Sequence, residues 1–278
     1  MTLVIKLGGA EAIDPVATVE DIADFVADGE SIVVVHGGST TIDETLDAVG
    51  LEPEYVTTSG GITGRFTDAE AMQAVTMALA GSLNVDLTVS LQNAGVDAVG
   101  LAGVDGALAT GPRKSAVRVL EAGKRKVKRG DHAGRIDTVN DHLLSTLLEA
   151  GYTPVVSLPM LADDGVAVNT DADRLAAAIA AALDAALVLL TDVGGVYADI
   201  DDPSSRIDSV DSPDDLRAVT DAAVGFMTRK VMAATEALEG GADEVYIADA
   251  TVDEPLSAAL SGAATRFTTG AITEVVNG

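Results

Sequence analysis

Two isolated lysines are the residues of this chain that most clearly could carry chemistry. The chain has 44 Asp and Glu residues against 17 Lys and Arg. Four of its six lysines lie between residues 114 and 128, whereas Lys6 and Lys230 stand alone in acidic surroundings. Because so acidic a chain keeps few ammonium groups on its surface, we interpret each isolated lysine as a contact for a negatively charged ligand.

Two glycine pairs follow apolar runs near the N-terminus. Gly8 and Gly9 come directly after the Lys6 run, and Gly37 and Gly38 precede a predicted helix. Glycine lets backbone N–H groups approach an anion, and a helix N-terminus adds positive potential. Either pair alone could be an ordinary tight turn, but together with the lysine they predict two phosphate-binding turns. Neither pair fits the P-loop or the dinucleotide-binding pattern, so those two classes are disfavoured.

Polar residues open the helix predicted to begin near residue 171. Asn169, Asp171 and Asp173 occupy alternate positions directly after an apolar run. One of them is explained as the helix cap, since Asn and Asp accept hydrogen bonds from the first free N–H groups of a helix. Three exceed what capping needs, so we expect the others to bind a ligand and to order the two lysines.

A third glycine turn follows the most apolar run of the chain, residues 186–191. Open α/β sheets bind their ligands outside the carboxyl ends of their strands, so a nucleotide is expected there. The residues that we assign to nucleotide binding are Thr191, Asp192, Gly194, Gly195 and Tyr197.

The pattern of the whole chain predicts an α/β fold. Short apolar runs at 3–7, 32–36, 98–101, 154–158, 186–191 and 244–248 alternate with helical patterns at 16–28, 40–49, 68–94, 138–150, 171–184, 213–222 and 227–240. Such alternation indicates an open, mostly parallel sheet sandwiched between helices, a three-layer αβα arrangement. A shift in composition near residue 165 divides the chain into two lobes, 1–165 and 166–278.

Composition excludes several classes of protein. With 47% apolar residues the chain is globular, and without cysteine it has no disulfides. It begins without a basic, apolar leader, and its pattern predicts no membrane-spanning stretch, so we expect a cytoplasmic protein. The net charge of −27 is spread along the chain, which is typical of halophilic proteins and disfavours nucleic acid as a partner. The three histidines are too scattered for a metal cluster.

Five motifs, in this order along the chain, resemble those of the amino acid kinase superfamily and specifically its acetylglutamate kinase branch. They are K6-L-G-G, H36-G-G, N169-x-D-A-D173, L190-T-D-V-G-G-V-Y197 and M227-T-R-K230. The resemblance implies the amino acid kinase fold, with substrate binding in the first lobe and ATP binding in the second. It also implies transfer of the γ-phosphoryl group of ATP to the side-chain carboxylate of an acidic amino acid whose amino group is blocked.

The resemblance assigns roles to the motif residues. Lys6 would contact the transferring phosphoryl group, Lys230 would neutralise charge on the ADP side, and Asp173 would hold both ammonium groups. Gly8, Gly9, Gly37 and Gly38 would donate backbone N–H groups, and Mg²⁺ would arrive with ATP, without a metal site built by the protein.

Arg65 matches the family arginine that binds a substrate carboxylate, with Asn169 on the same ligand. A guanidinium group suits a carboxylate because it can donate two parallel hydrogen bonds. The alternative is a surface arginine paired with Asp68 or Glu70. The loop before Arg65 is longer than in standard acetylglutamate kinases, which leaves the substrate open.

Residues 113–135 form a strongly basic segment. They hold nine basic residues and two acidic ones, a formal charge of +7, whereas the rest of the chain carries −34. Alternating apolar and basic residues around Ala122-Gly123 predict a hairpin. The segment could pair with the protein's own acidic surface or, less well, with nucleic acid, but an acidic protein partner fits best.

The basic segment also resembles that of the carrier-dependent subgroup of the family. Those kinases phosphorylate glutamate or 2-aminoadipate attached by its amino group to a small acidic carrier protein, in arginine or lysine biosynthesis. The carrier would dock on Lys124, Arg125, Lys126, Lys128 and Arg129. Free N-acetylglutamate kinase is the alternative, a non-catalytic binding regulator is a distant one, and a homodimer is expected.

Overall fold

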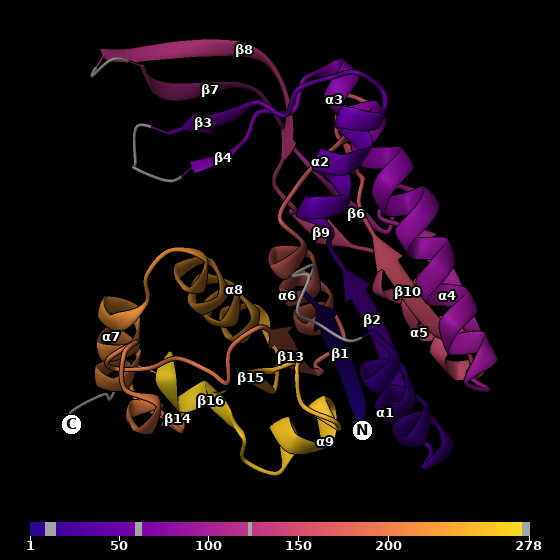
Figure 1. Cartoon of the computed structure of the whole chain (residues 1–278). Coiled ribbons are helices and arrows are strands. Elements are labelled where there is room, and N and C mark those ends of the chain that lie inside the picture. Colours follow the sequence, from indigo (N-terminus) through magenta and orange to yellow (C-terminus); the bar gives the residue numbers. More distant parts are fainter. Residues whose placement is uncertain (9–14, 59–62, 122–123, 274–278) are drawn as a thin grey trace.

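The computed structural model describes residues 1–8, 15–58, 63–121 and 124–273. Within them, one eight-stranded sheet has helices on both faces (Figure 1). Its strands lie in the order β14 (Ser209–Val210), β16 (Ala264–Thr268), β15 (Glu244–Asp249), β13 (Ala186–Thr191), β1 (Thr2–Leu7), β2 (Ser31–His36), β10 (Thr153–Ser157) and β5 (Ala98–Ala102). From β15 to β5 neighbouring strands are parallel, whereas β16 is antiparallel to β15.

The helices cover the sheet as two layers. They are α1 (Pro15–Ala27), α2 (Ser39–Ala48), α3 (Ala69–Thr76), η1 (Met77–Leu83), α4 (Asn84–Asn93), α5 (Asp141–Glu149), α6 (Ala172–Ala182), α7 (Pro213–Ala222), α8 (Phe226–Gly240) and α9 (Pro255–Leu260). Buried residues of α1 and α9 belong to the core on one face, and those of α6 and α8 to the core on the other. The three-layer arrangement predicted from the sequence is therefore confirmed.

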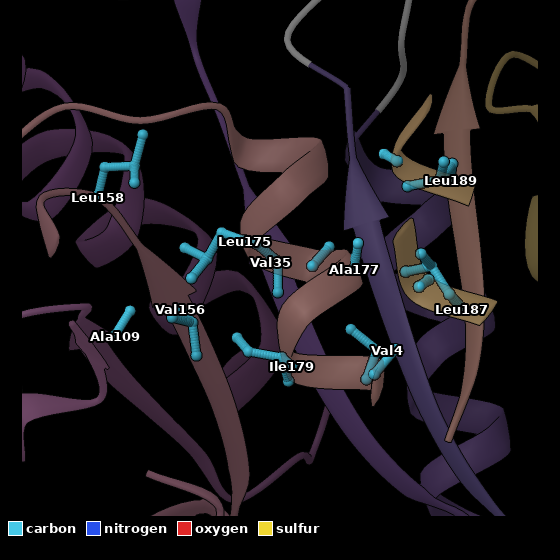
Figure 2. Close-up of a cluster of buried hydrophobic side chains, with 14 of the residues drawn as sticks. Val4, Val35, Ala109, Val156, Leu158, Leu175, Ala177, Ile179, Leu187 and Leu189 are labelled. Atoms are coloured by element: carbon cyan, nitrogen blue, oxygen red, sulfur yellow. The ribbon is translucent and has the colours of Figure 1, made fainter. Parts of the chain in front are cut away.

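Alternation along the central strands decides which residues face which layer. Val4 of β1 and Leu187 of β13 pack with Ile179 of α6 on one face (Figure 2). Leu3 and Ile5 of β1 belong to the core on the opposite face. Because successive side chains of a strand point to opposite faces, Lys6 lies on the same face as Val4, toward α6.

Smaller strands extend the fold beyond the carboxyl ends of the central strands. β3 (Tyr55–Thr57) pairs with β4 (Thr63–Arg65), and β7 (Arg113–Glu121) pairs with β8 (Lys124–Gly134), both antiparallel. A four-stranded sheet holds β12 (Ala167–Val168), β11 (Met160–Ala162), β6 (Ala109–Gly111) and β9 (Thr138–Val139). The two hairpins lie side by side at one end of the molecule, joined by a bridge between Thr58 and Val119 (Figure 1).

The structure departs from the predicted elements in a few places. The helix predicted over 138–150 begins at Asp141, because Thr138–Val139 is strand β9 and Asn140 caps α5 through its side chain. The sequence patterns also missed β14, β16 and α9. These elements are short, and β16 carries the polar residues Thr265 and Arg266 between its apolar ones, which weakens the signal of a buried strand.

Residues 69–93 form one continuous helix of 25 residues that includes a π-helical segment, η1. By length and composition alone it is apolar enough to cross a membrane, which the sequence analysis did not anticipate. Core helices pass the same test. Here Met72, Val75 and Leu79 are buried in the protein core, but only 33% of the most apolar 18-residue window is buried.

Candidate active site

A buried cluster of three charges lies at the carboxyl ends of the central strands. Lys6 Nζ is 2.6 Å from Asp173 Oδ1, and Lys230 Nζ donates to Asp173 Oδ2 at 3.1 Å. The three side chains are about nine-tenths buried. They come from β1, α6 and α8, so the fold brings together residues more than two hundred positions apart in the sequence.

The electrostatics of this cluster favour the charged form of Asp173 and oppose that of Lys230. Burial acts to raise the pKa of Asp173, but the charges of Lys6 and Lys230 and their hydrogen bonds outweigh it, so that its pKa lies below the ordinary value. Burial and the charge of Lys6 lower the pKa of Lys230, although Asp173 opposes them. With all three charged, the cluster carries one uncompensated positive charge in a poorly solvated place, and an anion would balance it.

The start of α6 shows that Asn169, Asp171 and Asp173 make different contacts, which the sequence alone did not distinguish. Asp171 is the helix cap, since its Oδ1 accepts from the N–H groups of Asp173 and Arg174. Asp173 is turned inward to the lysines instead. Asn169 lies two residues before Asp171, and its Nδ2 donates to Thr67 Oγ1 at 3.3 Å. The three alternate polar residues thus serve three different contacts.

The two predicted phosphate turns line one pocket of about 340 Å³, at Gly8, Gly37 and Gly38. A Cβ atom on Gly38 would lie 2.3 Å from Leu83 Cδ1, so a side chain there would have to displace Leu83 of helix 69–93. The N–H of Gly8 donates to the carbonyl of Leu190 at 3.1 Å, so a phosphate contact from this N–H would need that bond to open. Gly9 lies outside the described residues.

Arg65 is held by protein partners that the sequence did not predict. Its guanidinium group pairs with Asp43 of α2 at 2.6 Å and also donates to Ser39 and to the Tyr55 hydroxyl. The predicted pairing of Arg65 with Asp68 or Glu70 is wrong, and Asp68 instead caps α3. These bonds use the Nε and Nη2 atoms of Arg65. Its Nη1 atom donates no hydrogen bond to any residue that the structure describes.

The predicted nucleotide segment follows β13 at the same edge of the sheet as Lys6. Thr191 ends the strand, and its hydroxyl donates to Asp192 Oδ1 at 3.0 Å. Gly195 has a φ of +141°, and a Cβ atom there would lie 2.5 Å from the hydroxyl of Thr265. Tyr197 forms an isolated backbone bridge with Arg206. Packing against β16 therefore accounts for Gly195 apart from any ligand.

Two polar residues near the turns were not predicted to matter. Asn84 is buried, and its Nδ2 donates to the carbonyl of Val155 at 2.9 Å and lies 3.1 Å from His36 Nε2. Burial and the charge of Lys6 lower the pKa of His36, although a bond to the Gly37 carbonyl opposes them. Nothing in the sequence pattern marks this pair, because its members lie 48 positions apart.

Arg229, beside Lys230, was also missed. Its guanidinium group donates to the carbonyl of Thr63 in β4 and lies 3.9 Å from Asp171. It therefore ties the start of α8 to the hairpin that carries Arg65. The signal that could have found it is the scarcity of basic residues, which makes any arginine next to a functional lysine worth attention.

The basic hairpin is joined to the site at its base. The N–H of His132 donates to the carbonyl of Thr67, and the N–H of Asn169 donates to the carbonyl of His132, each at 2.7 Å. The N–H of Gly134 then returns a bond to the carbonyl of Asn169. Strand β8 thus runs between the segment after Arg65 and the residue that precedes α6.

The fold is an α/β sheet between helix layers, and its site gathers two lysines on one buried aspartate at the carboxyl edge of the sheet, an arrangement suited to binding an anion. The model of the amino acid kinase family matches residues 1–249. The chain belongs to the amino acid kinase family, and its kinase relatives confirm that it is an enzyme of this type.

Relatives of known name are similar over nearly the whole chain. An [LysW]-aminoadipate kinase of Deinococcus radiodurans is 42% identical, covering 95% of this chain and 90% of its own. A protein of the same name from Thermus thermophilus is 40% identical, covering 95% and 98%. An acetylglutamate kinase of Methanopyrus kandleri is also 40% identical, covering 88% and 93%.

Solved structures show the same fold at lower identity. An N-acetylglutamate synthase of Neisseria gonorrhoeae superposes with a TM-score of 0.76 at 23% identity, over 96% of this chain and 59% of the synthase chain. A carbamate kinase of Giardia lamblia superposes with a TM-score of 0.66 at 16% identity, over 96% of this chain and 98% of its own. The predicted fold is confirmed.

The charge cluster predicts unequal effects of its members on stability. Asp173→Asn should lower the free energy of unfolding by about 3 kcal/mol, because it leaves two ammonium groups buried without a counter-charge. Lys230→Met should change it by less than about 1 kcal/mol, because a balanced Lys6–Asp173 pair remains. Urea unfolding of both variants measures this. Equal losses would contradict the assigned charges, and Asp173→Asn/Lys230→Met should regain part of the lost stability.

His36 predicts a pH dependence of stability. Its pKa in the folded protein is lowered, so below its ordinary value of about 6.5 the unfolded chain binds the proton more readily. The free energy of unfolding should therefore fall as the pH decreases from about 7.5 through the ordinary histidine pKa. His36→Gln should flatten this fall in urea unfolding, whereas His142→Gln, at an exposed position, should preserve it. A fall of the same slope in His36→Gln would exclude the assignment.

Proposed function

We propose that this enzyme uses ATP to phosphorylate the side-chain carboxylate of 2-aminoadipate or glutamate that is linked by its amino group to a small acidic carrier protein of the LysW type. The observation that carries the proposal is the bonded connection between the basic hairpin and the site, through His132, Thr67 and Asn169. The names of the Deinococcus and Thermus relatives support it.

The reaction asks for positioning and charge more than for acid–base chemistry. A substrate carboxylate oxygen would attack the γ-phosphorus of ATP, forming an acyl phosphate as the bond to ADP breaks. The attacking group is already ionised near neutral pH, so no general base is required. Lys6 would stabilise the transferring phosphoryl group and Lys230 the departing ADP, with Asp173 fixing both ammonium groups.

The unbalanced positive charge of the cluster fits a polyphosphate. Nothing in the described residues gathers three or more His, Asp or Glu side chains as a metal site. Mg²⁺ would come with ATP and, when bound, would neutralise charge on the phosphates. Thr191, Asp192, Gly194, Gly195 and Tyr197 would bind the nucleotide, in the 166–278 lobe.

The 1–165 lobe would bind the amino acid. Arg65 would contact a substrate carboxylate through Nη1 while Asp43 holds the rest of its guanidinium group. Asn169, from the other lobe, donates to Thr67, two residues after Arg65, and would bind the same ligand. Gly37 and Gly38, and after local rearrangement Gly8, would bind the phosphoryl group.

Comparison of three substrates tests this function. Acyl phosphate formation, trapped with hydroxylamine, would be measured with LysW-linked aminoadipate, LysW-linked glutamate and free N-acetylglutamate. We expect turnover of the carrier-linked substrates and little of the free one. Glutamate and aminoadipate differ by one methylene, which a pocket discriminates by only about 10 to 200-fold, so use of both is expected. Turnover of N-acetylglutamate alone would replace this proposal with the acetylglutamate kinase function of the Methanopyrus relative.

Lys6→Met should separate catalysis from binding. We expect kcat to fall by about 100-fold or more, because the charge that develops on the transferring phosphoryl group loses a donor. The dissociation constant of ADP, measured by calorimetry, should change by less than about threefold. Lys114→Met is the matched control, since Lys114 is an exposed lysine outside the assigned sites. Equal loss of turnover and ADP binding would show that Lys6 only binds the nucleotide.

We also propose that the enzyme acts in the cytoplasm as a homodimer, in arginine or lysine biosynthesis. Among the described residues β5 is the last strand of the sheet, and a second copy could lie along that edge. Met77, Val85 and Val89 of helix 69–93 are each about half exposed. The spread of acidic residues is consistent with a halophilic enzyme. The elution volume on a calibrated gel-filtration column, measured at low and high KCl, tests whether the protein is a dimer and whether that dimer needs high salt.

A further inference from the structure

The register of hairpin β7–β8 sorts its side chains onto two faces. Opposite residues share a face, and neighbours along a strand alternate. One face, here named the arginine face, holds the pairs Arg118 with Val127, Leu120 with Arg125, and Ala116 with Arg129. The other, the lysine face, holds Val117 with Lys128, Val119 with Lys126, and Lys124 at the tip.

The lysine face is turned partly to the protein itself. Val119 is 1% exposed. Lys128 pairs with Glu54, and its Nζ lies 4.0 Å from the ring centre of Phe66. Lys126 also has an interaction. The residues predicted to dock the carrier therefore lie on both faces of the hairpin. Some of the lysines among them already interact with other residues of the protein.

The arginine face is exposed at every position. Val127 is 60% and Leu120 39% exposed, although both are large aliphatic residues, and the arginines around them are exposed as well. Each cross-strand pair sets one arginine beside one apolar residue. A charged and apolar mixture of this kind is typical of recognition surfaces, where arginine is enriched.

The arginines of this face differ from the others in forming no ion pair with any carboxylate that the structure describes. Of the eleven arginines, eight form ion pairs: Arg65, Arg113, Arg135, Arg174, Arg206, Arg217, Arg229 and Arg266. With the side chains that the structure describes, Arg118, Arg125 and Arg129 form none. In a chain with 44 carboxylates this argues against the protein's own acidic surface as their partner.

The surrounding charge selects the kind of partner. The rest of the chain carries a net charge of −34, which repels an acidic molecule, whereas the hairpin attracts it. The hairpin therefore determines where an acidic partner binds and in which orientation. Exposed Leu120 and Val127 between the arginines suit a folded acidic protein better than a phosphate backbone, which offers them nothing to pack on.

We propose that the arginine face, and not the lysine face, is the docking surface for the acidic carrier protein. Carrier carboxylates would pair with Arg118, Arg125 and Arg129 while apolar carrier residues pack on Leu120 and Val127. The inference rests on the proposed function. From Arg129 to His132, where β8 is bonded to the site, is about 10 Å of extended strand, so a flexible carrier terminus of a few residues can deliver its amino acid to the site.

Two triple variants with the same loss of charge test the choice of face. Arg118→Gln/Arg125→Gln/Arg129→Gln alters the arginine face, and Lys124→Gln/Lys126→Gln/Lys128→Gln alters the lysine face. We expect the first to raise KM for LysW-linked aminoadipate by about tenfold or more and the second by less than about threefold. KM of the unaltered enzyme should rise with KCl, and this rise should be largely absent in the arginine variant.

Each remaining outcome has one meaning. If the unaltered enzyme does not use LysW-linked substrate, the proposed function fails. If it does, but both variants raise KM equally or only the lysine variant does, the docking face is wrongly assigned. A change of oligomeric state in the arginine variant, or binding of a DNA duplex as tight as that of LysW, would also overturn it. Should the triple variant not fold, by circular dichroism, the single charge reversals Arg125→Glu and Lys124→Glu make the same comparison.

Discussion

The contact of two ammonium groups with one buried carboxylate is the constraint on which this structure depends. Removing three charges from water is costly, and Asp173 can balance only one of the two lysines. The fold supports that cost by large apolar layers on both faces of the sheet. The imbalance leaves an uncompensated positive charge at the carboxyl edge of the sheet, where the parallel strands also place the turns after β2 and β13.

The second organising feature is strand β8, which belongs to two regions at once. Its outer part carries the arginine face, and its inner part is bonded to the segment after Arg65 and to Asn169. Arg229 adds a tie from α8 to β4. In the proposed function, the surface that binds the carrier and the residues that position the carboxylate would share one continuous set of backbone hydrogen bonds, which would limit how independently the two can move.

Much of this fold could be predicted because its signals are local. Apolar runs ending in glycine mark the central strands, and the rarity of lysine singled out Lys6 and Lys230. The contact of both with Asp173 followed from family motifs and is present in the structure. What could not be predicted depends on distant partners: Asp43 on Arg65, Asn84 beside His36, and Thr265 against Gly195.

The hairpin shows the same limit at finer scale. Its existence follows from alternation, but the face that each basic residue occupies depends on the register, and which face is covered depends on Glu54 and Phe66. Likewise, the start of the predicted helix at 138 was wrong because a strand two residues long pairs with β6, a contact that no local pattern records.

The distribution of lysine also makes the molecule unusual as a chemical reagent. Lys6 and Lys230 are buried, so the amines open to solvent are the α-amino group of Met1 and the lysines of residues 114–128. Across the rest of its large surface an amine-directed cross-linker finds nothing to attack. A neighbour captured by such a reagent would therefore have been held next to the hairpin or the N-terminus, and a dye attached the same way would report on those two places alone.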